Sequence, residues 1–172
     1  MRDRIPELRL ATFGFALNAL WEALQTPLYA DRGGAALYMI KTRLHCAVGD
    51  VLILLSCFAI VSLMWRKRHW IATRSVAPRL LFVTLGLGYT IASEVVHTRW
   101  LPSWAYAPEM PILFGVGLAP ILQWLLIPSL LLFILEPSRA LGDRGLPQAR
   151  PRHPQVEPPA ADGSAERPWR VD

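Results

Sequence analysis

Four apolar stretches, each long enough to cross a lipid bilayer as a helix, dominate this chain. About 20 helical residues span the hydrocarbon core of a bilayer, and a soluble domain rarely contains four such stretches. Of the 172 residues, 53% are hydrophobic and only 18% are charged. We therefore predict an all-α, polytopic membrane protein, with residues 1–136 forming a four-transmembrane-helix bundle. The predicted spans are residues 10–30, 44–65, 80–100 and 111–135.

The first stretch is the least apolar, because Asn18, Glu22 and Gln25 interrupt it. A cleaved signal peptide is the alternative interpretation, since arginines precede the stretch and the small residue Ala30, at its end, could mark a cleavage site. The apolar centre of a signal peptide does not normally contain Glu and Asn, so we favour a retained first helix.

The basic residues are distributed unevenly between the two sides of this four-span arrangement. Of the 18 Lys and Arg residues, 14 fall on the side that holds both termini and the connection between the second and third spans. Because loops rich in Lys and Arg remain in the cytoplasm, we expect a multi-pass protein of the bacterial inner membrane with cytoplasmic N- and C-termini. The net charge of +5 does not indicate nucleic acid, since the basic residues lie in short loops and tails.

The composition changes after Glu136. Residues 137–172 are rich in Pro, Arg and Ala and show no apolar periodicity. Such a segment cannot bury enough apolar surface to fold, so the sequence predicts a disordered, Pro/Arg-rich cytoplasmic tail.

Three carboxylates lie inside predicted spans: Glu22, Asp50 and Glu94. An ionisable group at the centre of a bilayer costs at least roughly 3 kcal/mol, so such residues indicate a functional site. In the predicted topology all three lie at a similar depth, in the outer half of the bundle. Helical spacing places further polar residues on the same faces, and we predict a shared pocket. Its other polar members are Asn18, Gln25, Thr90 and Gln123.

A metal ion is one candidate ligand for this pocket. Glu94 and His97 have the Glu-x-x-His spacing that places a carboxylate and an imidazole on one metal in di-iron helical bundles. With Glu22, His45 and Asp50 they form a predicted ligand set suited to a divalent ion such as Zn, Mn or Fe. A hydrogen-bonded structural network or a proton-carrying network is the alternative for the same residues.

Three segments carry a resemblance to known proteins. They are residues 21–29 (WEALQTPLY), residues 45–50 (HCAVGD) and the stretch from Trp104 to Gln123. Over roughly residues 10–135 the chain resembles a group of bacterial four-helix inner-membrane proteins that have no assigned activity. The resemblance implies the fold and the location alone. The last segment is also faintly similar to membrane carotenoid hydratases and cyclases, and this implies no catalytic residue.

Three functions remain open from the sequence. The pocket could hold a metal ion or relay protons, as in a binding or transport module. Glu94 or Asp50, with His97, could instead serve as acid and base in a membrane enzyme that acts on an isoprenoid or another lipid. In the third hypothesis, the chain is an accessory subunit, and the polar faces of its helices contact another protein. Its partners would then be the lipid bilayer and either a second copy of the chain or a membrane complex.

Overall fold

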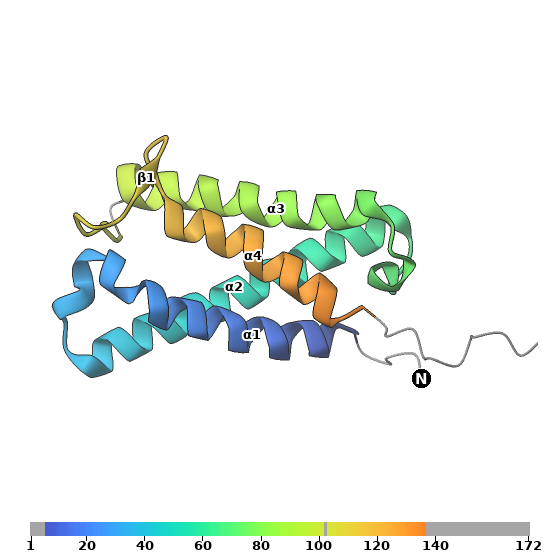
Figure 1. Ribbon diagram of the computed structural model, residues 1–172, viewed down its shortest axis with the longest axis horizontal. Helices are drawn as coiled ribbons and strands as arrows, with labels where there is room; N and C mark the ends of the chain where they lie inside the picture. The colour runs from blue at the N-terminus through green and yellow to red at the C-terminus, as the bar shows by residue number, and fades with distance from the viewer. Residues whose placement is uncertain (1–5, 102, 137–172) are drawn as a thin grey trace, which may run out of the picture. The chain divides into compact units, whose positions relative to one another are not determined.

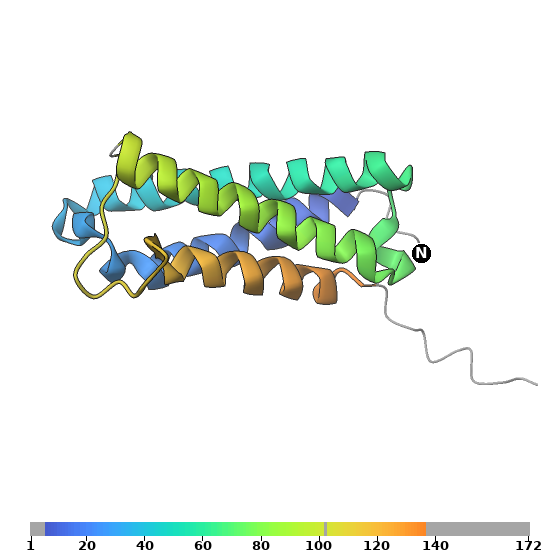
Figure 2. The ribbon, with the colours of Figure 1, turned by 90° about the horizontal axis from the view of Figure 1, so that it is seen from above.

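The structure, a computed structural model that describes residues 6–101 and 103–136, is a bundle of four antiparallel helices (Figures 1 and 2). Each helix packs on the next along the chain, and α1 also packs on α4. The all-α prediction is confirmed for the described residues, although the bounds of the helices differ from the predicted spans. The four helices are α1 (Pro6–Gln25), α2 (Ala36–Trp65), α3 (Val76–Val95) and α4 (Leu118–Ile134).

The two ends of the bundle differ in the length of their connections. We call one the short-loop end, because only residues 66–75 connect α2 to α3 there. The other, the long-loop end, carries residues 26–35 and the longer segment 96–117. From the short-loop end, α2 and α3 diverge, so that the start of α2 and the end of α3 lie apart at the long-loop end (Figure 1).

The first two helices are offset from their predicted spans. α1 ends at Gln25 and is followed by two 3₁₀ turns, Thr26–Leu28 and Ala30–Gly33. Pro27 explains this end, because proline lacks the N–H that would continue an α-helix. α2 begins eight residues before the predicted span, at Ala36. The prediction followed apolarity and stopped at the polar residues 41–43, whereas the helix continues through them.

The predicted start of the fourth helix at Pro111 is wrong. A small hairpin precedes α4, with β1 at Ile112–Leu113 paired to β2 at Val116–Gly117. The two turn residues, Phe114 and Gly115, have φ angles of 51° and 81°. Positive φ at both positions is typical of the tight turns that join antiparallel strands, and it is incompatible with an α-helix.

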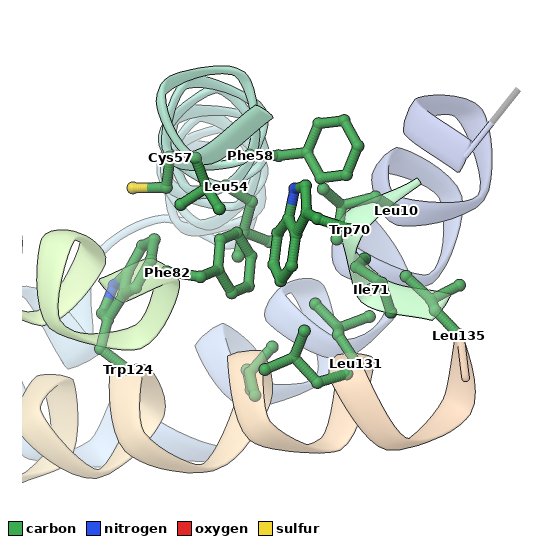
Figure 3. Packing of buried hydrophobic residues seen from close by; sticks show 13 residues of the cluster. Leu10, Leu54, Cys57, Phe58, Trp70, Ile71, Phe82, Trp124, Leu131 and Leu135 are labelled. Carbon is green, nitrogen blue, oxygen red and sulfur yellow. The ribbon is translucent and has the colours of Figure 1, made fainter. Parts of the chain in front are cut away.

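An aromatic core fills the short-loop half of the bundle (Figure 3). Trp70, from the 3₁₀ turn Trp70–Thr73 in the short connection, is completely buried. Its ring lies 5.7 Å from that of Phe58 and 5.5 Å from that of Phe82, centroid to centroid. Leucines from α1, α2 and α4 surround these rings, including Leu10, Leu54 and Leu131. This half of the bundle is therefore held together by apolar packing.

Among residues 6–101 and 103–136, two helices are long and apolar enough to cross a membrane, by length and composition. They are Ala36–Trp65, which is 30 residues long, and Val76–Trp100, which is 25 residues long and includes the π-helical turn Val96–Trp100 after α3. Leu118–Ile134 is apolar but shorter. The predicted tail, residues 137–172, lies outside the described residues.

Candidate functional site

The three carboxylates of the predicted spans line one cavity at the long-loop half of the bundle. The cavity has a volume of about 340 Å³. Glu22 reaches it from α1, Asp50 from α2 and Glu94 from α3. The side chains of Glu22 and Glu94 are buried, with 4% and 7% of their surface exposed, and Asp50 is half-buried. Three acidic groups from three helices therefore share one small space.

Glu22 is held by neighbours on its own helix. Its Oε1 atom accepts a hydrogen bond of 2.7 Å from the side-chain amide of Gln25. The Oε1 atom of Gln25 in turn accepts a hydrogen bond of 3.0 Å from the indole N–H of Trp21. This chain of donors fixes the rotamer of Glu22 and directs the carboxylate at the cavity.

Asp50 is held by a link across three helices. The side-chain amide of Gln123 in α4 donates to Asp50 Oδ2 and to Asn18 Oδ1, both at 2.8 Å. Asn18 itself donates to the carbonyl of Gly14, at 2.8 Å. Both amide hydrogens of Gln123 are thus used, and they join α1, α2 and α4 just below the cavity.

Glu94 is held by the long loop that follows α3. Its Oε2 atom accepts hydrogen bonds from the indole of Trp104, at 3.3 Å, and from the Tyr106 hydroxyl. The same hydroxyl accepts a hydrogen bond of 3.0 Å from the backbone N–H of Gly117. Burial raises the pKa of Tyr106, and its hydrogen bond to Glu94 raises it further. Tyr106 therefore stays protonated and donates to the carboxylate.

The two buried carboxylates, Glu22 and Glu94, each have one oxygen atom that accepts no side-chain hydrogen bond from the described residues. Among the described residues, side chains donate only to Oε1 of Glu22 and only to Oε2 of Glu94. A carboxylate has four acceptor positions, so each of these groups keeps capacity for a donor inside the cavity.

Of the arginines in the described part of the chain, Arg43 alone lines the cavity, and it is already paired. Arg43 forms a salt bridge with Asp31, and its guanidinium lies 5.1 Å from the centre of the Tyr29 ring. His45 also lines the cavity, at an exposed position. Asp31 brings the number of lining carboxylates to four, against this one arginine. The charge of the wall is therefore predominantly negative when these groups are ionised.

The structure does not bring together the five predicted metal ligands. Glu22, His45, Asp50 and Glu94 line the cavity, but His97 does not. The His97 ring stacks on Trp104 at 4.4 Å, and its Nδ1 atom lies 3.1 Å from the hydroxyl of Ser103. Its π-helical turn breaks the 3.6-residue spacing on which the Glu-x-x-His prediction depends. Within residues 6–101 and 103–136, no group of three His, Cys, Asp or Glu residues is placed to hold a metal ion.

The other predicted pocket residues divide between the cavity wall and its support. Gln25, Thr90 and Gln123 line the cavity. Asn18 lies deeper, where it accepts the hydrogen bond from Gln123. All four are buried.

The two connections at the long-loop end are bonded to each other. The backbone N–H of Ala30 donates to the carbonyl of Ala105, and that of Ala107 donates to the carbonyl of Leu28, both at 2.9 Å. Arg32 and Glu109 form a salt bridge of 2.7 Å. The Arg32 guanidinium lowers the pKa of Glu109 by hydrogen bonding to it. These contacts fix Tyr106, and thereby Glu94, in place.

The predicted pocket residues did not include most of the α2 wall or the loop residues Trp104 and Tyr106. Tyr38, Thr42, Cys46, Gly49 and Ile53 line the cavity from one face of α2. Their spacing of three or four residues is a signal that was available, and it would also have placed the start of α2 before residue 44. The role of Tyr106 has no such signal, because it depends on how the loop folds back onto α3.

Comparison of the chain with family models, with curated proteins and with solved structures gives no match. The resemblance to bacterial four-helix inner-membrane proteins therefore stays a prediction.

Proposed function

We propose that the chain is a membrane protein with four spans, although α1 and α4 are less suited to span by length and composition than α2 and α3. The support is the outward face of these two helices. On α1, Leu8, Leu20 and Leu24 are 58–68% exposed. On α4, Phe133 is 76% exposed, and this helix contains no charged residue. Such faces are unfavourable in water and favourable against lipid.

Reporter fusions test this topology. Fusions after residues 35, 72, 105 and 140 should report outside, inside, outside and inside, because the basic connection 66–75 stays in the cytoplasm. A cytoplasmic signal at residue 105 would contradict the four-span arrangement.

Within this bundle, we propose that the cavity binds a positively charged molecule. The observation that carries the proposal is the convergence of Glu22, Asp50 and Glu94 on one cavity whose arginine is paired with Asp31. Carboxylates removed from water are costly unless a positive charge or a hydrogen-bond donor compensates them. The free oxygens of Glu22 and Glu94 supply the acceptors. Trp104 and Trp124, which line the cavity, offer aromatic faces that attract a cation.

Cys46 allows a direct test, since it lines the cavity and Cys57 is the only other cysteine in the chain. In a Cys57→Ala background, Cys46 should react faster with an ammonium-bearing methanethiosulfonate reagent than with the sulfonate-bearing reagent of similar size. Substitution of Glu94 by Gln should reduce the ratio of the rate with the ammonium reagent to the rate with the sulfonate reagent. The substitution removes one negative charge and changes the shape of the side chain little.

The matched control for this substitution is Glu7→Gln, which removes a carboxylate from α1 outside the cavity, where it pairs with Arg68. The ratio of the two rates should not change in this variant. Equal rates for the two reagents in the protein with all its carboxylates would contradict a cation-binding cavity.

A second candidate function rests on the contact between Glu94 and Tyr106. A carboxylate that accepts a hydrogen bond from a phenol resembles the acid and base pairs of enzymes, and a membrane enzyme acting on a lipid would use such a pair to move a proton. The lipid extract of a deletion strain tests this candidate. An altered lipid restored by the wild-type gene and not by the Tyr106→Phe variant would favour it, and an unchanged extract would exclude it.

A further inference from the structure

The cavity is open at the side of the bundle, between α2 and α3. Two of its lining residues, Tyr38 of α2 and Tyr89 of α3, are each 57% exposed. His45 is exposed on the same side of α2, and Ser103 and Ala105 are exposed in the loop above α3. These residues form what we call the side opening. The two helices that carry Tyr38, His45 and Tyr89 diverge toward the long-loop end (Figure 1).

The side opening extends far along the helices. Tyr89 precedes Trp100, the last residue of the helical segment, by eleven residues, which corresponds to about 16 Å along the axis. A bilayer core is roughly 30 Å thick, so Tyr89 lies near its middle when the segment Val76–Trp100 spans it. An opening confined to the water-facing end of the bundle would not reach this residue.

The helices that carry the side opening also expose apolar side chains. Leu44, Val48 and Leu52 of α2 are 46%, 48% and 60% exposed, and Ile91 of α3 is 37% exposed. By contrast, backbone hydrogen bonds between residues 28–30 and 105–107 close the bundle over α1. In a membrane-spanning arrangement, the side opening would therefore lie between two helices whose outward faces are apolar.

We propose that the ligand is a membrane-dissolved amphiphile with a protonated amine as its polar head, and that it enters sideways from the bilayer between α2 and α3. This inference rests on the proposed cation-binding function. The ammonium head lies among Glu22, Asp50 and Glu94, and the alkyl chain passes between Tyr38 and Tyr89 into the lipid.

The chemistry of the cavity fits such a head group. A primary ammonium has three N–H donors, which matches the spare oxygens of buried carboxylates. Trp104 and Trp124 line the cavity and provide aromatic faces for the cation and for the first methylene groups. A volume of about 340 Å³ is near the lower limit for small-molecule sites, which are roughly 300–1,000 Å³. It accommodates a head group and leaves a long chain in the lipid.

Protection of Cys46 tests the inference. The full-length Cys57→Ala protein is reconstituted into phosphatidylcholine vesicles, and the ammonium-bearing reagent is applied with dodecylamine, dodecanol, dodecanoate or butylamine at the same total concentration. Dodecylamine should slow the modification of Cys46 roughly tenfold, a factor that corresponds to about 1.4 kcal/mol. Dodecanol and dodecanoate should not protect, since they lack the positive charge, and butylamine should not protect, since it stays in the water.

The outcomes separate this inference from the proposed function. Protection by butylamine equal to that by dodecylamine would overturn entry from the bilayer and leave cation binding intact. Protection by dodecanol or dodecanoate would overturn the amine head group. A lack of protection by every compound, with the ammonium reagent still favoured over the sulfonate reagent, would overturn the amphiphilic ligand alone. Loss of the preference between reagents would overturn the proposed function itself.

A pair of variants tests the route. Ser93 of α3 lines the cavity, whereas its neighbour Ala92 is exposed and does not line it. Ser93→Phe should reduce protection by dodecylamine, because the ring occupies the space beside the side opening. Ala92→Phe places the same ring against lipid and should leave protection unchanged. Equal protection in both variants would contradict entry between α2 and α3.

Discussion

The two halves of the bundle are built from the same four helices, yet they bury different kinds of side chain. The short-loop half packs Trp70 between Phe58 and Phe82, with leucines around them. The six buried polar or charged side chains of the described residues lie at or beside the cavity of the other half. They are Asn18, Glu22, Gln25, Thr90, Glu94 and Gln123. One half is thus packed for stability, whereas the other half buries costly polar groups, which the proposed binding of a cation would explain.

The largest expected effect is on the aromatic core. Trp70→Ala should lower the free energy of unfolding by about 3–5 kcal/mol, because it empties a fully buried site among rigid rings. Denaturant unfolding in detergent measures this loss. Trp100→Ala is the control, since Trp100 is 73% exposed and its removal leaves no internal void. Equal losses in the two variants would contradict the assigned core.

The next largest loss of stability is expected at the boundary between the two halves of the bundle, where Trp124 packs on Gly86. A Cβ atom added at Gly86 would lie 2.1 Å from the Trp124 ring, whereas one added at Gly88 meets nothing within 4 Å. Gly86→Ala should therefore destabilise the protein by roughly 1–3 kcal/mol through overpacking, and it should displace Trp124 from the cavity wall. Gly88→Ala should not lower the melting temperature. Indistinguishable melting temperatures for the two variants would mean that the ring does not lie on Gly86.

Removal of the hydrogen bonds from Gln123 to Asn18 and Asp50 should lower the free energy of unfolding by a similar or smaller amount. Gln123→Leu keeps the volume but leaves Asn18 Oδ1 and Asp50 Oδ2 without their shared donor. The expected cost is about 1–3 kcal/mol, and binding of a cation should weaken as Asp50 loses its position. Thr84→Val serves as the control, because the Thr84 hydroxyl is exposed and bonds only to its own helix. A fully stable Gln123→Leu variant would show that the link has no structural role.

The smallest effect is expected at the ion pair between the long-loop connections. Arg32 lowers the pKa of Glu109, so this contact stabilises the fold above the usual pKa of Glu, about 4.3, and the benefit is lost as the pH falls through the lowered pKa. Glu109→Gln should lower the melting temperature slightly at pH 7 and not at all in strong acid. If Glu109→Gln still lowers the melting temperature in strong acid, the loss does not come from the charge of Glu109.

The predictability of the two halves from the sequence also differs. Long apolar stretches predicted the helices, because a helix that faces lipid must satisfy its own backbone hydrogen bonds. The rule for ionisable residues in spans selected Glu22, Asp50 and Glu94, all of which line the cavity. Helical periodicity assumes an unbroken helix, and for that reason it misplaced His97 in the π-helical turn and missed the hairpin before α4.

The contacts made by loops were beyond sequence reasoning altogether. Tyr106 bonds to Glu94 only because residues 28–30 and 105–107 exchange backbone hydrogen bonds. Such contacts join segments more than seventy residues apart, and their register leaves no periodic mark in the sequence. The same is true of Trp70, whose place in a short polar connection gives no indication that it is the most buried ring of the core.

The two native cysteines allow the central claim, an accessible cavity in one half and a sealed core in the other, to be measured directly. Cys46 lines the cavity, and Cys57 is buried in the core with 4% of its surface exposed. The measurement is the rate at which a small ammonium-bearing thiol reagent modifies each cysteine in membranes, in the Cys57→Ala and Cys46→Ala variants. The account predicts that Cys46 reacts in the folded protein and that Cys57 reacts only after unfolding. Modification of Cys57 at the same rate as Cys46 in the folded protein would contradict it.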